Sequence, residues 1–148
     1  MRKVDIVSQI IDFANAQQNA AYLVGETDLD TLDAAAHDEG HLVRRVSLAG
    51  CHDKNDLLLR IAKALAFPTT FGANWDALAD CLGDLAWLPA AAGYVWLFDH
   101  AGALHAAPDG DFDTLCGILD HACKRWQARG IACFACIAFA DAIATWRG

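Results

Sequence analysis

A chain of 148 residues, 55% of them hydrophobic, is long enough to bury the core of a single domain. Its formal net charge of −8 argues against nucleic acid or an anionic membrane as a direct partner and favours a basic protein. The N-terminal segment lacks the uninterrupted apolar stretch of a signal peptide, and no apolar run is long enough to span a bilayer, so we expect a cytoplasmic protein.

The first part of the chain combines helical and strand patterns. Apolar residues recur at helical spacing over residues 3–18, which predicts an amphipathic helix. Residues 20–24 read as a short strand, and a helix beginning at residue 27 or 28 and running to about 39 should end at Gly40. With a further strand over 42–48, these pieces make a plausible βαβ unit.

From residue 53 onward, helices alternate with strands that are apolar throughout. Such strands are typical of a parallel sheet covered by helices, so the sequence predicts an α/β fold. Helices are predicted over 56–66, 74–87 and 111–129, strands over 94–98 and 131–139, a short helix or loop over 99–106, and a helical turn over 141–146.

The helix predicted from residue 74 has two different faces. Trp75, Leu78, Leu82 and Leu85 fall on one side, whereas Asp76, Asp80 and Asp84 fall on the other. Like charges at i,i+4 destabilise a helix by roughly 0.2–0.5 kcal/mol per pair. This acidic face is therefore either a solvated surface of an acidic protein or a binding surface for a cationic partner.

The stretch from Phe67 to Leu82 reads F-P-T-T-F-G-A-N-W-D-A-L-A-D-C-L. It resembles the signature of the barstar family, small inhibitors of guanyl-specific ribonucleases, and weaker similarity extends over residues 42–139. The resemblance implies three parallel strands over 42–48, 94–98 and 131–138, to which 20–24 would add a fourth at the sheet edge. We therefore expect one domain, with an N-terminal extension (1–40), a barstar-like core (41–139) and a C-terminal tail (140–148).

The resemblance also implies a partner-binding surface on the loop and helix of residues 67–87. Asp80 matches the family's central aspartate, and the remaining implied contacts include positions that depart from the family pattern. Thr70, Ala79 and Leu85 stand at or near aromatic positions of the family, and Arg125 and Arg129 stand where the family presents glutamates. The full implied set is Thr70, Phe71, Asn74, Asp76, Ala79, Asp80, Asp84, Leu85, Arg125 and Arg129.

Other chemistry finds little support in the sequence. Cys133 and Cys136 would point to opposite faces of a strand, and no second pair follows at zinc-ligand spacing, so we expect six reduced thiols, mostly buried, and no metal. No nucleophile or phosphate-binding motif is present, so we expect neither catalysis nor a cofactor. The favoured interpretation is an antitoxin or immunity-type inhibitor of a basic ribonuclease or related toxin, monomeric by preference. Two alternatives are a protein of the same fold with a partner that is not a ribonuclease, and a small hydrolase using Cys81.

Overall fold

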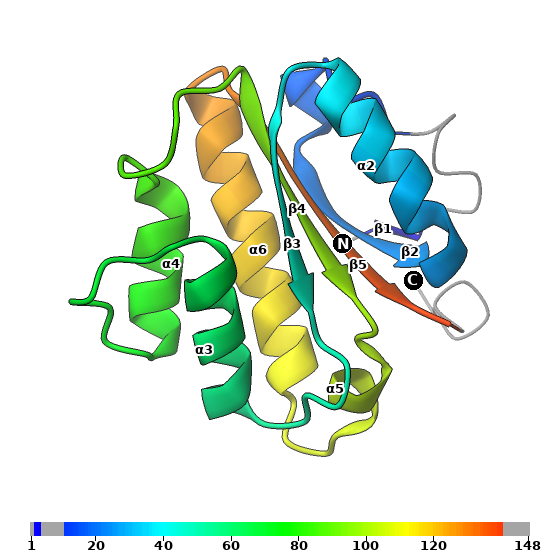
Figure 1. Ribbon diagram of the computed structural model, residues 1–148, viewed down its shortest axis with the longest axis vertical. Coiled ribbons are helices and arrows are strands. Elements are labelled where there is room, and N and C mark those ends of the chain that lie inside the picture. The colour runs from blue at the N-terminus through cyan, green and yellow to red at the C-terminus, as the bar shows by residue number, and fades with distance from the viewer. Residues whose placement is uncertain (1, 4–10, 141–148) are drawn as a thin grey trace.

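The computed structural model of the protein describes residues 2–3 and 11–140 (Figure 1). A parallel sheet forms its centre, with strand order β1-β2-β5-β4-β3. The strands are β1 (Arg2–Lys3), β2 (Ala20–Gly25), β3 (Leu42–Ser47), β4 (Gly93–Asp99) and β5 (Ala132–Phe139). The helices are α2 (Leu29–Asp38), α3 (Lys54–Ala64), α4 (Trp75–Asp84), α5 (Gly102–Ala106) and α6 (Asp111–Ala128), with 3-10 turns η1 (Ala16–Gln18) and η2 (Glu26–Asp28).

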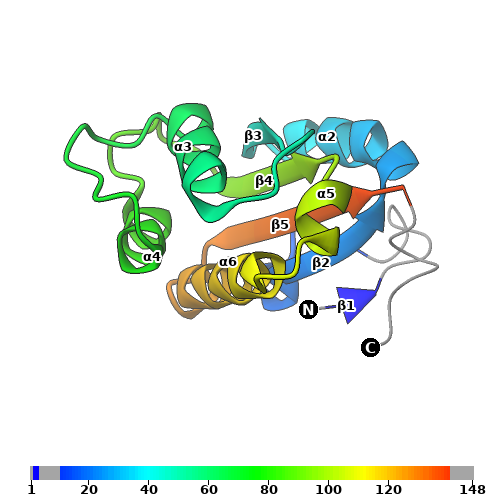
Figure 2. The same cartoon turned by 90° about the horizontal axis from the view of Figure 1, so that it is seen from below.

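Helices cover the two faces of the sheet unequally (Figure 2). On one face α2 packs over side chains such as Tyr22 and Phe134. On the other face α3, α4, α5 and α6 enclose a larger core that includes Trp96 and Phe98. Because successive side chains of a strand alternate between faces, β2, β4 and β5 contribute to both cores and are apolar throughout.

The predicted parallel sheet is confirmed. β4 pairs with β5 in parallel, as the apolar runs indicated, and β2 is the expected fourth strand. β2 does not end the sheet, however, because the two-residue β1 pairs with its outer side. The predicted βαβ unit is also more open than expected, since β5 and β4 lie between β2 and β3.

The helix predicted over residues 3–18 is wrong wherever the structure describes it. Arg2–Lys3 is a strand, and residues 11–18 form turns that end in η1, whereas residues 4–10 lie outside the described residues. Asp12 Oδ1 accepts a hydrogen bond from the Ala14 amide, and Asn15 Oδ1 accepts one from the Gln17 amide. Such local side-chain bonds satisfy the backbone without a helix. The turn predicted over 141–146 also lies outside the described residues.

Asn19 joins the N-terminal segment to the rest of the protein. Its side chain is fully buried, donates to the carbonyls of Cys123 and Ile131, and accepts from the Cys133 amide. Nearby, Asp120 on α6 accepts a hydrogen bond from the Ala21 amide. Residues 11–40 are thereby fixed against the α6–β5 connection by polar contacts as well as by the core.

The cysteines take part in the packing, and all are free in the described structure. Cys133 and Cys136 face opposite sides of β5, as predicted. Cys116 and Cys123 on α6 are buried, also as predicted, and burial raises the pKa of the Cys116 thiol to about 12. No helix among residues 11–140 is long and apolar enough to cross a membrane.

Candidate partner-binding surface

Aromatic packing fixes the loop that precedes α4. Phe67 contacts Phe71 with ring centroids 4.9 Å apart and contacts Trp87 at 5.8 Å, both edge to face. The Trp87 Nε1–H donates to the Leu65 carbonyl at 2.9 Å, which ties the residues after α4 to the end of α3. Phe71 is therefore half-buried and supports the loop, whereas Thr70 is exposed at the loop surface.

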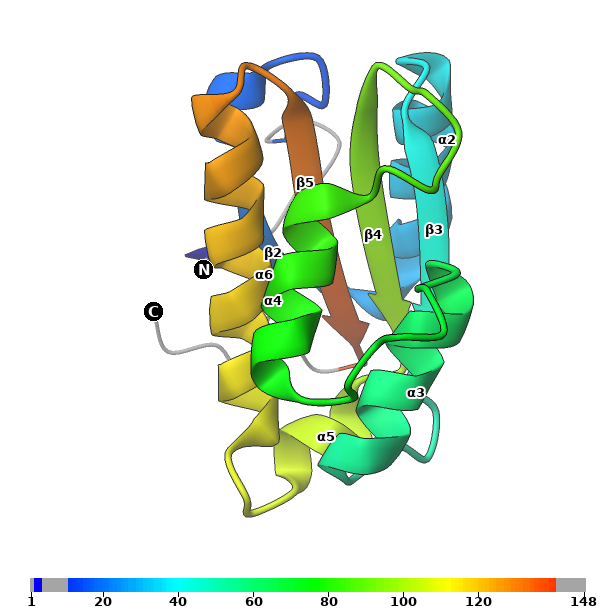
Figure 3. The ribbon, with the colours of Figure 1, turned by 90° about the vertical axis from the view of Figure 1, so that its left-hand side faces the viewer.

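Asn74 begins α4 as the sequence predicts. Its Oδ1 accepts a hydrogen bond from the Ala77 amide at 2.8 Å, the geometry of an N-cap. Leu78 and Leu82 of this helix are fully buried, and the half-buried Trp75 lies under the Lys54 ammonium, 5.6 Å from its ring centroid. Consequently α4 has one well-defined orientation on the outside of the molecule, between α3 and α6 (Figure 3).

Three aspartates occupy the exposed side of α4. Asp76, Asp80 and Asp84 are all solvent-exposed. Within the described residues, the carboxylates of Asp76 and Asp80 have neither an ion pair nor a hydrogen-bond partner, whereas Asp84 accepts from the Ala86 amide at 3.3 Å. Burial, with Asp84 and Asp80 close by, raises the pKa of the Cys81 thiol. A cation from outside could therefore pair with Asp76 or Asp80 without first breaking an internal interaction.

Arg125 and Arg129 of α6 contact α4 instead of pairing with acidic residues. Arg125 donates to the Ala79 carbonyl at 3.3 Å, and Arg129 donates to the Gly83 carbonyl at 3.0 Å. The Arg129 guanidinium also lies 3.8 Å from the ring centroid of Trp126, whose Nε1–H donates to the Leu82 carbonyl. Positive charge near the C-terminal half of a helix complements its dipole. These arginines therefore join α6 to α4, a role that the sequence did not reveal.

A hollow lies between α4 and α6 beside the acidic face. Its volume is about 310 Å³, and Ala79, Ile118 and Ala122 contribute to its wall. Arg125 forms part of its rim, close enough to Gly83 that an added Cβ there would lie 2.7 Å from the guanidinium. The small side chain of Ala79 leaves this space open where a larger residue would fill it.

One of the implied contact residues is not available on this surface. Leu85 is 1% exposed and belongs to the core. α4 ends at Asp84, earlier than the predicted residue 87, because Leu85 adopts a left-handed conformation with φ of 55°. We therefore leave Leu85 out of the proposed contacts.

The structure thus collects nearly all of the implied residues on one side of the molecule. The exposed loop, the acidic side of α4 and the two arginines on α6 form a continuous surface, which we call the α4 face. A comparison with models of known families matches residues 41–138, about two thirds of the chain, to Barstar (barnase inhibitor). A search of curated proteins finds no match. The matched region contains the whole α4 face and three of the sheet's strands, and the chain accordingly belongs to the barstar family.

Proposed function

We propose that this protein is a cytoplasmic antitoxin or immunity-type inhibitor that binds a basic ribonuclease and covers its active site with the α4 face. The observation that carries this proposal is the exposed pair Asp76 and Asp80, which lack internal partners in the described structure. The family supports it, because its description is that of a barnase inhibitor. The protein would act by binding alone, without catalysis or a cofactor.

The physical basis is electrostatic mimicry of the substrate. A ribonuclease must bind the phosphates of RNA with cationic side chains, and carboxylates on a rigid helix can occupy the same positions. The net charge of −8 would also accelerate the encounter with a basic enzyme. Because Asn74 caps α4 and Trp126 holds it from behind, little conformational entropy would be lost on binding.

The arginines of α6 narrow the choice of partner. Arg125 and Arg129 are exposed and place positive charge next to the acidic helix. A partner that is basic throughout its contact area would be repelled at this edge. We therefore expect a ribonuclease whose active site is cationic but whose rim facing α6 is neutral or acidic.

The test is an inhibition titration. Purified protein is added to barnase and to a panel of other basic ribonucleases, and the rate of RNA cleavage is measured. We expect stoichiometric inhibition of at least one enzyme, and a large loss of inhibition with Asp80→Ala. The matched control is Asp38→Ala, which removes the same charge from an exposed position on α2, on the opposite face of the sheet. Equal inhibition by both variants, or none by the wild type, would contradict the proposal.

A further inference from the structure

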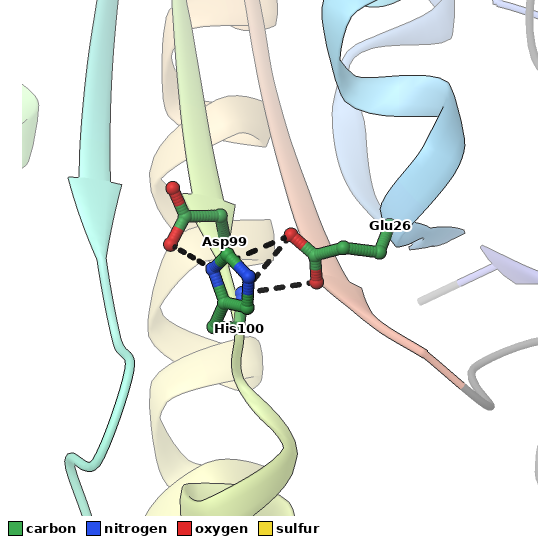
Figure 4. Close-up of side chains that lie close together, drawn as sticks. All are labelled: Glu26, Asp99 and His100. Atoms are coloured by element: carbon green, nitrogen blue, oxygen red, sulfur yellow. Dashed lines mark hydrogen bonds and ion pairs between the residues drawn. The ribbon is translucent and has the colours of Figure 1, made fainter.

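Three residues far from the α4 face converge on one ring nitrogen (Figure 4). His100 Nδ1 lies 2.8 Å from Asp99 Oδ1 and 3.7 Å from Glu26 Oε1. The Glu26 carboxylate also accepts a hydrogen bond from the His100 backbone amide, across 74 positions of sequence. One donor atom from each side chain lies within 4.8 Å of the others. Two carboxylates and an imidazole thus surround a single point.

This cluster, Glu26–Asp99–His100, lies where parallel sheets commonly bind ligands. Glu26 directly follows β2, and Asp99 ends β4, so both stand at the carboxyl edge of the sheet. The connection after β2 leads to α2 on one face, whereas that after β4 leads to α5 and α6 on the other. In open parallel sheets, the crevice between connections that depart to opposite faces is the usual ligand site.

A cavity is present at this place. It has a volume of about 460 Å³, and residues that follow β2, β3, β4 and β5 all line it, including Glu26, Gly50, His100 and Ala140. The side chain of His100 is 61% exposed, whereas those of Glu26 and Asp99 are 23% and 12% exposed. An ion held by the cluster would thus have protein ligands on one side and open space for water or a further ligand on the other.

We propose that Glu26, Asp99 and His100 form a binding site for a divalent transition-metal ion, bound in the position between His100 Nδ1 and the two carboxylates. Imidazole nitrogen with carboxylate oxygens is a donor set suited to Zn²⁺ and its first-row neighbours, and less suited to Ca²⁺ or Mg²⁺, which take oxygen ligands. Small side-chain movements would bring the donors to the roughly 2.0–2.2 Å bonds that Zn²⁺ makes with nitrogen and oxygen.

The surrounding residues support such a site. Arg45 Nε lies 3.3 Å from Asp99 Oδ2, the oxygen that does not face His100. Asp99 can therefore keep this contact while Oδ1 binds the ion, in the way that outer residues commonly orient metal ligands. Glu26 lies outside the region matched to the family, whereas Asp99 and His100 lie inside it. The site thus needs both the N-terminal extension and the family core.

The experiment is a calorimetric titration of the full, chelator-treated chain with Zn²⁺, and separately with Ca²⁺ and Mg²⁺. We expect one Zn²⁺ per chain and a thermal melt that rises with Zn²⁺ but not with the other ions. Glu26→Gln and His100→Gly should each weaken Zn²⁺ binding by at least about 100-fold, since outer ligand partners alone contribute about 10- to 100-fold. Glycine suits position 100 because His100 has a φ of 53°.

Matched controls address unrelated zinc binding. His37→Ala removes the exposed imidazole that pairs with Asp33, and Cys81→Ser removes the half-buried thiol; neither should change the titration. As a measurement on the unmutated chain, Zn²⁺ should protect His100 from carbethoxylation while His37 remains reactive. The proposal is overturned if Zn²⁺ does not bind, if Ca²⁺ or Mg²⁺ binds as tightly, if the control variants abolish binding, or if His100 is not protected.

Discussion

Replacing Asp80 by alanine should separate the stability of this protein from its binding. Asp80 stands between Asp76 and Asp84 at i±4 on α4, so its removal relieves two unfavourable pairs. At roughly 0.2–0.5 kcal/mol per pair, this gain is about 0.4–1 kcal/mol, and the better helix propensity of alanine adds a few tenths. For a chain of this size the melting temperature should rise by about 1–4 °C.

The same substitution should weaken the complex strongly. We expect a loss of more than about 2 kcal/mol in binding, roughly 30-fold in Kd, which is the usual threshold for an interface hot spot. Barnase with barstar is one of the complexes behind that generalisation, so its size is borrowed from the family. The loss should lie mainly in the dissociation rate, because a buried charge pair slows dissociation more than it guides encounter.

Thermal unfolding and binding kinetics on two further variants complete the experiment. Asp84→Ala, at the end of α4, should mainly lower the association rate and its dependence on salt. Asp38→Ala on α2 should change neither rate by more than its small effect on net charge. If Asp80→Ala unfolds the protein while the remaining folded fraction keeps full affinity, the aspartate is structural and our interpretation of the acidic face is wrong.

Three other predictions follow from particular contacts. Arg125→Gln with Arg129→Gln should speed association with barnase and slow it with the natural partner, and unchanged rates with both enzymes would place α6 outside the interface; glutamine is preferred to glutamate because both arginines donate to carbonyls of α4. Asn19→Ala should lower the free energy of unfolding in urea by about 3 kcal/mol, because it leaves buried backbone groups unpaired, whereas Asn55→Ala at an exposed position should cost less than about 0.5 kcal/mol. In native protein near pH 8, a thiol reagent should modify Cys81 first and the five buried cysteines only on unfolding, since burial raises the pKa of Cys116 and Cys136; rapid reaction of all six would contradict the packing of the core.

The sequence predicted most of the sheet because local signals and tertiary structure agree there. The run at residues 94–98 is apolar on both faces and lies in a strand that is covered on both sides. The boundary of α4 was equally readable, because Asn74 is both a preferred N-cap residue and the observed one. Where one residue type has one favourable use, a single sequence is sufficient.

Prediction failed where two local interactions compete or where the deciding contact is distant. The apolar spacing before residue 18 favoured a helix, but Asp12 and Asn15 satisfy nearby amides in turns instead. Asn19 gave no sign of its buried role, since its partners lie more than one hundred positions away. The contacts of Arg125 and Arg129 with α4 were hidden for the same reason: they depend on how two helices pack.

The N-terminal forty residues change what the carboxyl edge of the sheet can do. In the region matched to the family, the connections after β3 and β4 both pass over the face that carries α3, α4 and α6, so that region alone has no point where connections diverge. β2 creates one, because its connection leads to α2 on the opposite face, and Glu26 stands at the start of that connection. The α4 face uses no residue of β2 or α2. Glu26→Gln should therefore leave ribonuclease inhibition unchanged and Asp80→Ala should leave Zn²⁺ binding unchanged, with additive effects in the double variant, as is usual for distant sites. Loss of inhibition on mutation of Glu26 would show instead that the extension and the α4 face are coupled.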